Sequence, residues 1–143
     1  MTVAAILSGK GHETITARSD TPLSDICETL AKNKIGAVVV CSKDKAIEGI
    51  VSERDIVRAI GTQGTSSLQL PVSSVMTKEV VTCSEANSVN EVMARMTQGR
   101  FRHMPVVKDG KLTGVISIGD VVKHKIAQVE LEAEQMRNYI SMS

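Results

Sequence analysis

The sequence has 143 residues, of which 42% are hydrophobic and 23% are charged, a balance typical of a folded globular protein and not of a disordered or fibrous one. Seventeen Lys and Arg against sixteen Asp and Glu leave a formal net charge of +1, which argues against nucleic acid or an anionic membrane as the main partner. Aromatic residues make up only 1%, so we expect an aliphatic core and no stacking platform for single-stranded nucleic acid.

The first half of the chain predicts a helix, two strands and a second helix. Residues 21–33 are expected to be helical because Pro22 suits the first helical position and apolar residues follow at spacings of three and four. Residues 35–40 form a continuous β-branched run typical of a buried strand, and residues 47–51 predict its hairpin partner. A further helix is expected over residues 55–60.

The second half predicts the same order after a Gly-, Ser- and Thr-rich linker at residues 61–71. A helix is expected over residues 88–98, followed by strands over residues 104–107 and 112–116. The last helix is expected to begin near Gly119. Each half therefore has the order β-α-β-β-α, with a short leading strand before the first helix.

The two halves are an internal repeat. The segment GIVSERDIV, which contains Asp55, returns 65 positions later as GVISIGDVV, which contains Asp120. Thr16 matches Thr82 in the same way, and the lead-in VAAIL resembles VSSVM. We therefore predict an α+β fold of two units, residues 1–69 and 70–143, each with a three-stranded mixed sheet that has two helices on one face. Because each unit is small, we expect the two to pack against each other through their sheets.

The C-terminal segment predicts a helix of about 20 residues that is longer than one repeat needs. Its apolar residues recur at spacings of four and three, at positions 122, 126, 129, 133, 136 and 140. One interpretation is a homodimer contact, and the other is packing against the chain's own N-terminal residues 3–7.

The cysteines, Cys27, Cys41 and Cys83, contain no C-x-x-C pair, which favours small buried side chains in a reducing cytoplasm over zinc ligands or a redox dithiol. No apolar run has the length of a membrane span or a signal-peptide core. The three histidines are scattered, and no known catalytic or Walker-type motif occurs. We therefore expect a cytoplasmic protein that is not an enzyme and has no metal site.

The repeated motifs resemble those of CBS domains. The pattern G-h-h-S-x-x-D-h-h (h, hydrophobic) occurs twice, a hydrophobic-Thr pair precedes a helix twice, and Arg102-His103-Met104-Pro105-Val106-Val107 is similar to the family's R-H-x-P-V-V. The resemblance covers essentially the whole chain and is to a stand-alone bacterial CBS pair, or Bateman module. It implies pseudo-two-fold packing and a regulatory module with AMP, ATP, NAD(H) or S-adenosylmethionine in the clefts between the repeats. It also implies a homodimer and a protein effector in trans.

The repeated aspartates are the main candidate ligand residues. Asp55 and Asp120 each open a helix after a strand, where a carboxylate can accept both hydroxyls of a ribose and the helix N-terminus attracts phosphate. Ser52 and Ser117 stand three residues earlier and can meet ribose or phosphate oxygens. The alternative is a capping box that only begins the helix.

Cationic residues distinguish the two sites. Arg54 precedes Asp55, whereas Gly119 precedes Asp120, so the two clefts should not be equivalent. The resemblance implies that Arg102 and His103 reach across the cleft to phosphate and that Pro105 removes a backbone donor beside the ligand. Each has an alternative, a solvated charge for Arg102 and a core side chain for His103. The remaining candidates near the ligand are Lys34, Arg100, Gly36 and Ala37.

The adenine slot must be lined by aliphatic residues and backbone. Candidate walls are Ile35, Val38, Val51, Met104 and Ile116, and backbone groups beside Thr16 and Thr82 can read the base edge. Phe101 is the one aromatic residue near a site, although such a Phe is often part of the core. The predicted function is an adenine-nucleotide sensor of energy or redox state, and the alternative is an interaction module that binds no ligand.

Overall fold

The computed structural model describes residues 1–142 and has the element order predicted for two repeats. The first half contains α1 (Val3–Lys10), β1 (Thr16–Ala17), α2 (Leu23–Asn33), β2 (Ala37–Cys41), β3 (Ile47–Ser52) and α3 (Glu53–Gln63). The second half contains the 3-10 helices η1 (Thr65–Gln69) and η2 (Val72–Ser74), then α4 (Val89–Gly99), β4 (His103–Lys108), β5 (Lys111–Ser117) and α5 (Ile118–Met142). Helix α1 was not predicted, since its eight residues appeared in the sequence only as a repeated lead-in.

Each repeat is built on an antiparallel hairpin. In the first repeat β2 pairs antiparallel with β3, and the short β1 adds a parallel edge, with Ala17 opposite Val40. In the second repeat β4 pairs antiparallel with β5, and Cys83 forms a single parallel bridge with Val106. The predicted third strand of the second repeat is therefore reduced to one residue pair.

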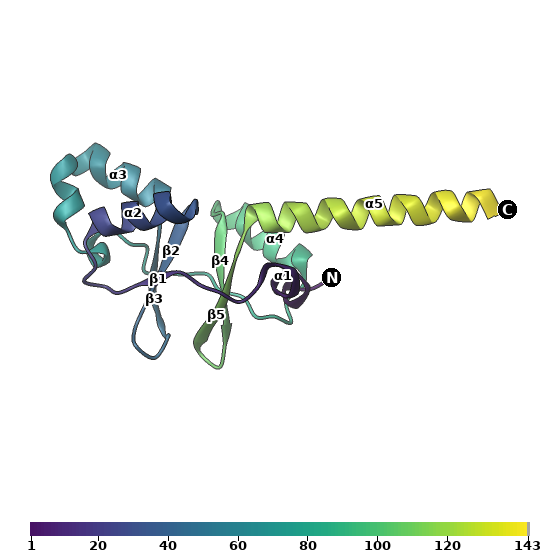
Figure 1. Cartoon of the computed structure of the whole chain (residues 1–143), viewed down its shortest axis with the longest axis horizontal. Coiled ribbons are helices and arrows are strands. Elements are labelled where there is room, and N and C mark those ends of the chain that lie inside the picture. The colour runs from purple at the N-terminus through teal and green to yellow at the C-terminus, as the bar shows by residue number, and fades with distance from the viewer. Residues whose placement is uncertain (143) are drawn as a thin grey trace.

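The two hairpins lie side by side, and α2, α3, α4 and the start of α5 lie toward the end of the hairpins away from their turns, while α1 lies beside β5 (Figure 1). The hairpins touch at their turns, where the backbone N–H of Leu112 donates to the carbonyl of Lys45 at 3.0 Å. Val39, Cys41 and Leu112 are buried but belong to neither core cluster. Helix α3 follows β3 directly and α5 follows β5 directly, so both helices begin at the end of the hairpins away from their turns.

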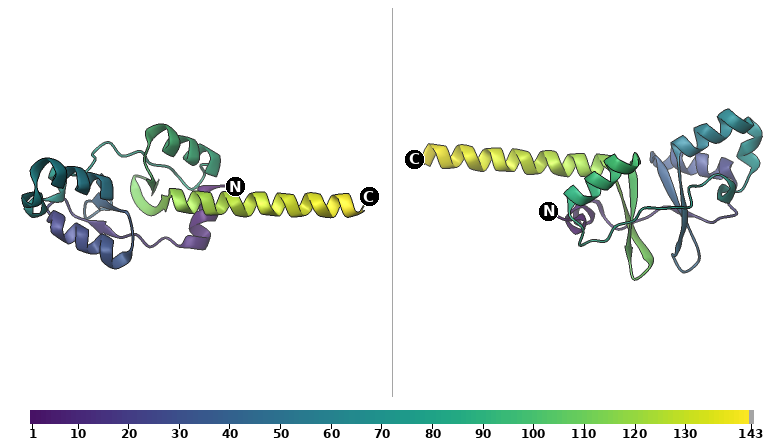
Figure 2. Two further views of the ribbon diagram at one scale, coloured as in Figure 1. Left: turned by 90° about the horizontal axis from the view of Figure 1, so that it is seen from above. Right: turned by 180° about the vertical axis from the view of Figure 1, so that it is seen from behind.

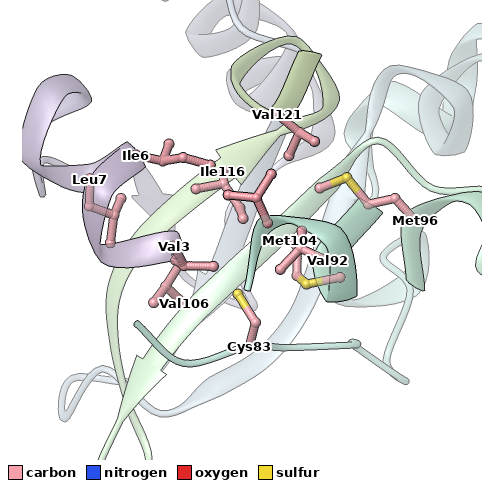
Figure 3. Packing of buried hydrophobic residues seen from close by; sticks show 11 residues of the cluster. Val3, Ile6, Leu7, Cys83, Val92, Met96, Met104, Val106, Ile116 and Val121 are labelled. Carbon is pink, nitrogen blue, oxygen red and sulfur yellow. The ribbon is translucent and has the colours of Figure 1, made fainter. Parts of the chain in front are cut away.

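Most of the buried apolar residues form two clusters, one in each repeat, and each cluster is completed by the segment that leads into the other repeat. Val3, Ile6 and Leu7 of α1 are buried among the strands and helices of the second repeat (Figure 3). Val72 is buried in the first repeat, with Val75 packed beside it. This exchange holds the repeats together, because removal of either lead-in would expose the other repeat's core.

Helix α5 extends well beyond the body (Figure 2). Its first turn is anchored by Val121, which is fully buried in the second cluster. Near its start the helix also contacts α1, and His124 Nδ1 lies 2.8 Å from Sδ of Met1, which precedes α1. The start of the segment therefore packs on the N-terminus, as one of the two sequence interpretations expects, and the rest projects into solvent. The homodimer contact stays a prediction. Among residues 1–142, no helix is both long and apolar enough to cross a membrane.

Candidate functional site

A cavity of about 480 Å³ opens between the two repeats at the start of α3. Three parts of the chain line it: the first repeat, the connection before Thr82, and the α4–β4 corner of the second repeat. The lining residues are Gly36, Ile50, Ser52, Glu53, Arg54, Asp55, Arg58, Thr77, Glu79, Val80, Val81, Gly99, Arg100, Phe101, Arg102 and His103. Its volume lies within the range of small-ligand pockets.

Asp55 lies in this cavity and also caps α3. Its Oδ2 accepts a hydrogen bond from the backbone N–H of Ser52 at 2.8 Å, and the Ser52 hydroxyl accepts from the backbone N–H of Asp55 at 3.4 Å. The other oxygen, Oδ1, accepts from the Thr77 hydroxyl at 3.3 Å and lies 4.0 Å from Arg58 Nη1. The expected capping box is therefore present at Asp55, and it fixes the carboxylate so that its other oxygen contacts two further cavity residues.

The basic residues of the cavity come from both repeats. Arg54 and Arg58 belong to α3, while Arg100, Arg102 and His103 come from the second repeat. Arg54 Nη1 donates to the carbonyl of Arg100 at 3.2 Å, so the two sets meet across the cleft. Five basic side chains against the acidic residues Glu53, Asp55 and Glu79 make the cavity suited to an anion that also carries hydroxyl groups.

Arg100 owes its position to a left-handed C-cap. It ends α4 with φ 58° and ψ 40°, and its counterpart Lys34 ends α2 with φ 54° and ψ 47°. This conformation turns each chain sharply from the helix into the following strand. In the second repeat that corner brings Arg100, Phe101 and Arg102 to the cavity.

His103 and Gly36 face each other across the repeats. A Cβ atom at Gly36 would lie 3.1 Å from His103 Cε1, so the glycine allows the ring to approach this closely. Burial lowers the pKa of His103, Lys10 and Arg102 lower it further, and the carboxylates of Glu53 and Asp120 act in the opposite direction. The imidazole is therefore held largely neutral at neutral pH, and it feels charges from both repeats.

Eight of the predicted site residues meet in the cavity, namely Gly36, Ser52, Arg54, Asp55, Arg100, Phe101, Arg102 and His103. Lys34 and Ile35 instead line a shallow hollow between α2 and α3, together with Cys27, Leu30 and Val57. Val51, Met104 and Ile116 are fully buried in the two core clusters, as is Val38.

The other predicted residues lie along the strands. Thr16 is exposed in β1 opposite Val39, and Ala37 begins β2 opposite Ser52. The carbonyl of Thr82 accepts from Arg95 Nη1 at 3.2 Å. Pro105 is buried in β4, where its carbonyl accepts from the backbone N–H of Cys83.

The second repeat reproduces the Ser-Asp arrangement with a different neighbour. Asp120 Oδ2 accepts from the backbone N–H of Ser117 at 2.8 Å, and the Ser117 hydroxyl accepts from the N–H of Asp120. The same oxygen lies 2.7 Å from Nζ of Lys10, at the end of α1. Burial alone would raise the pKa of Asp120, but the hydrogen bonds from Lys10 and Ser117 and the charge of Lys10 together lower it.

Sequence analysis did not identify several residues of the two sites. Ile50 lines the cavity because side chains alternate along β3, so that its neighbour Val51 points into the core. The cavity is also lined by Thr77, Glu79, Val80 and Val81. These residues lie in an irregular connection, where the sequence has no periodic apolar pattern that would predict their position. In residues 1–142 no group of three or more His, Cys, Asp or Glu side chains is placed to hold a metal ion.

Comparison with known families matches the CBS domain model to residues 11–62 and 72–127, that is, once to each repeat. Among curated proteins, the chain is 32% identical over 147 residues to the mitochondrial CBS domain-containing protein CBSX3 of Arabidopsis thaliana. That match covers 97% of this chain and 71% of the relative. Several longer Arabidopsis relatives are spanned to only 22% or 23% of their length.

Solved structures have the same fold. The CBS-domain protein ATU1752 from Agrobacterium tumefaciens superposes with a TM-score of 0.85 at 46% identity, covering 87% of this chain and 99% of that one. The CBS domain pair of MJ0100, solved with 5'-methylthioadenosine and S-adenosyl-L-methionine, gives a TM-score of 0.80 at 22% identity, covering 90% of this chain and 98% of that one. The predicted fold of two packed β-α-β-β-α repeats with a long final helix is thereby confirmed.

Proposed function

Since the chain belongs to the CBS-domain family as a tandem pair, we propose that it is a regulatory module that binds an adenine nucleotide in the cavity at Asp55. AMP, ATP and NAD(H) are the ligands that we expect, and the bound state signals energy or redox status to a partner protein in trans. One observation carries the proposal: a capped carboxylate lies in a cavity opposite basic groups from both repeats.

The cavity offers a separate contact for each part of a nucleotide. Asp55 Oδ1 is placed to accept hydrogen bonds from the ribose hydroxyls, which would displace the long contact from Thr77. Arg100, Arg102 and His103 are the groups for phosphate, which prefers guanidinium partners. The base fits against Phe101 and the apolar side chains of Val80, Val81 and Ile50, in place of an aromatic sandwich.

The comparison with MJ0100 supports the ligand class. That protein's structure holds two adenosine derivatives, and its fold is the fold of this chain. At 22% identity the likeness concerns the fold alone, so the choice of an adenine ligand here depends on the residues at Asp55. A nucleotide with phosphate suits this cavity better than a neutral adenosine derivative does, because of the basic groups from both repeats.

We further propose that the chain forms a homodimer through α5. The side chains of Val122, Ile126, Val129 and Met136 follow one face of the helix and are 45–60% exposed, so a second copy would cover this seam. With these residues at heptad positions a and d, a parallel pair sets Lys125 against Glu130 of the second copy.

The same parallel register sets Glu132 against Arg137 of the second copy. An antiparallel pair centred at residue 131 would instead bring Glu130 against Glu130 and Glu132 against Glu132. The charges of α5 therefore favour the parallel arrangement, although Lys125 also donates to Asn90 within its own chain. We propose a cytoplasmic, non-catalytic role for this dimer.

A different class of function, a dimerising interaction module that binds no ligand, makes the opposite prediction for nucleotides. The test is calorimetry of the dialysed protein with AMP, ATP and NADH, preceded by native mass spectrometry of the protein as purified. The proposal expects a co-purifying adenine compound or saturable binding of at least one ligand. No binding at millimolar concentration would leave only the interaction module.

A further inference from the structure

His103 lines the cavity at Asp55 and also lies near an ion pair outside it. On the cavity side, a Cβ atom at Gly36 would lie 3.2 Å from His103 Nε2 and 3.7 Å from Glu53 Oε1, so the imidazole and this carboxylate meet at the glycine. On the other side, His103 is paired across the hairpin with Ser117 of β5. The Cβ atoms of such a pair lie about 5 Å apart on the same face of the sheet. The imidazole is therefore close to groups inside and outside the cavity.

Ser117 connects His103 to the ion pair. Its backbone N–H donates to Asp120 Oδ2 at 2.8 Å, and its hydroxyl accepts from the Asp120 N–H at 3.2 Å. The same carboxylate oxygen lies 2.7 Å from Nζ of Lys10, which also donates to the carbonyl of Val115 at 2.8 Å. Lys10 is the last residue of α1, and α1 is itself packed in the core of the second repeat. The ammonium group is therefore held beside the β4–β5 hairpin.

Four charged groups act on His103. Glu53 of α3 and Arg102 of β4 line the cavity, whereas Lys10 ends α1 and Asp120 lies in the first turn of α5. Burial lowers the pKa of His103, Lys10 and Arg102 lower it further, and the two carboxylates act in the opposite direction. Lys10 has the largest effect of the four, so the main electrostatic obstacle to an imidazolium ion lies outside the cavity. The other charged residues of the cavity are Arg54, Asp55, Arg58, Glu79 and Arg100.

We propose that the Lys10–Asp120 ion pair controls the anion affinity of the cavity at Asp55 through His103. The proposal rests on the proposed function, since it takes His103 as a partner of the ligand's phosphate. A phosphate stabilises the imidazolium ion, the ammonium group of Lys10 opposes it, and the carboxylate of Asp120 supports it. The ion pair is 40% and 24% exposed and therefore weak. Because linkage is reciprocal, protonation of His103 in turn weakens the contact that holds the end of α1.

The first test needs no ligand. NMR titration of the histidine ring signals of the full chain gives the pKa of His103, whose signals are assigned by comparison with His103→Gln. We expect this pKa to rise in Lys10→Met, which removes the ammonium group and leaves Asp120 unpaired. Lys10→Arg keeps the charge and should keep the wild-type value. An unchanged pKa in Lys10→Met would overturn the proposal.

Two further variants separate charge from a loosening of the structure. Asp120→Asn keeps an oxygen that can cap α5 but removes the negative charge, so it should lower the pKa of His103. A general loosening would instead expose the ring to water and raise the pKa in both Lys10→Met and Asp120→Asn, and that result would contradict the proposal. Lys43→Met, at an exposed turn, is the control for loss of a lysine elsewhere and should change nothing.

The second test is calorimetry of AMP binding at pH 7 to the wild type, Lys10→Met, His103→Gln and the double variant. Loss of Lys10 removes a positive charge near the anion and also eases protonation of His103, and only the second effect needs the histidine. The change in AMP affinity caused by Lys10→Met should therefore be about 1.5- to 5-fold more favourable with His103 present than in the His103→Gln background. Equal changes in both backgrounds would overturn the proposal. If the wild type binds no AMP, the proposed function fails, while the ligand-free titration still shows whether the ion pair acts on His103.

Discussion

Asp55 Oδ2 accepts a hydrogen bond from the backbone N–H of Ser52 at 2.8 Å, so the same carboxylate caps the start of α3 and lines the cavity between the repeats. Substitution of Asp55 therefore has two consequences that must be separated, one for folding and one for binding.

The folding consequence is measured by comparing two substitutions at this position. Asp55→Ala removes the capping acceptor and should lower the free energy of unfolding by about 0.5–2 kcal/mol. Asp55→Asn keeps an acceptor oxygen, so its loss of stability should be clearly smaller. Urea titration followed by circular dichroism measures both values, and equal losses would show that the charge, and not the cap, stabilises α3.

A second prediction concerns pH and His103. Burial, followed by Lys10, lowers the pKa of this histidine, so the native state binds a proton less readily than the unfolded chain does. Stability without ligand should therefore fall as the pH drops below the ordinary histidine pKa of about 6.5. A phosphate bound beside His103 has the opposite effect on its pKa, because the negative charge stabilises the imidazolium ion.

The affinity of the wild type for AMP should consequently rise as the pH is lowered from 8 to 6.5. Binding should also be accompanied by a net uptake of protons, which calorimetry in two buffers of different ionisation enthalpy measures. His103→Gln keeps a polar side chain that does not titrate and serves as the control, since the ionisation of AMP itself affects both proteins equally. Identical pH profiles for the two proteins would mean that His103 does not face the phosphate.

A third prediction concerns α5. The full chain should be a dimer, and a chain ending at residue 127 should be a monomer that keeps the buried anchor Val121. Analytical ultracentrifugation distinguishes the two states. A dimer that survives the truncation would place the interface elsewhere.

The direction of the pairing is tested by exchanging charges. Glu132→Lys should weaken a parallel dimer because it faces Arg137 of the second copy, and adding Arg137→Glu should restore the dimer. In an antiparallel pair the single substitution would replace a Glu–Glu contact between the two copies with a Lys–Lys contact. It would therefore weaken the dimer less than it weakens a parallel one, or strengthen it. That outcome would contradict the parallel arrangement.

A fourth prediction concerns the cysteines, which are all free thiols. Burial raises the pKa of Cys83 to about 11, and Cys41 is only 4% exposed, so neither should react readily in the native state. Cys27 is partly exposed and should be modified first. Mass spectrometry after brief alkylation at pH 8 would show one modified site, and early modification of Cys83 would contradict its burial.

Much of the fold was predictable because the repeat supplied each element twice. The boundaries of α2 and α4 fall within two residues of those expected, since both helices have apolar residues at regular spacing. Helix α1 could not be predicted in the same way, because its buried face belongs to a core formed by Cys83 and later residues of the second repeat. The division of the chain at residues 69 and 70 stays a prediction.

The candidate site was predictable where a motif or the family resemblance pointed to it. Asp55, Arg102 and His103 meet in one cavity as expected. Val51 and Met104 were chosen as adenine walls from their apolar character, but side-chain alternation turns them into the cores. The contact of Lys10 with Asp120 spans 110 residues and depends on the packing of α1, so no local pattern indicates it.

The central claim, that a nucleotide binds in the cleft at Asp55, is tested most directly by calorimetry of AMP binding to the wild type and to Asp55→Asn. We predict saturable binding to the wild type and an affinity of this cleft for AMP that is about 10- to 100-fold lower in the variant. This loss corresponds to the contribution of about 1.5–3 kcal/mol from hydrogen bonds to a charged group. The same affinity and stoichiometry in both proteins would contradict it.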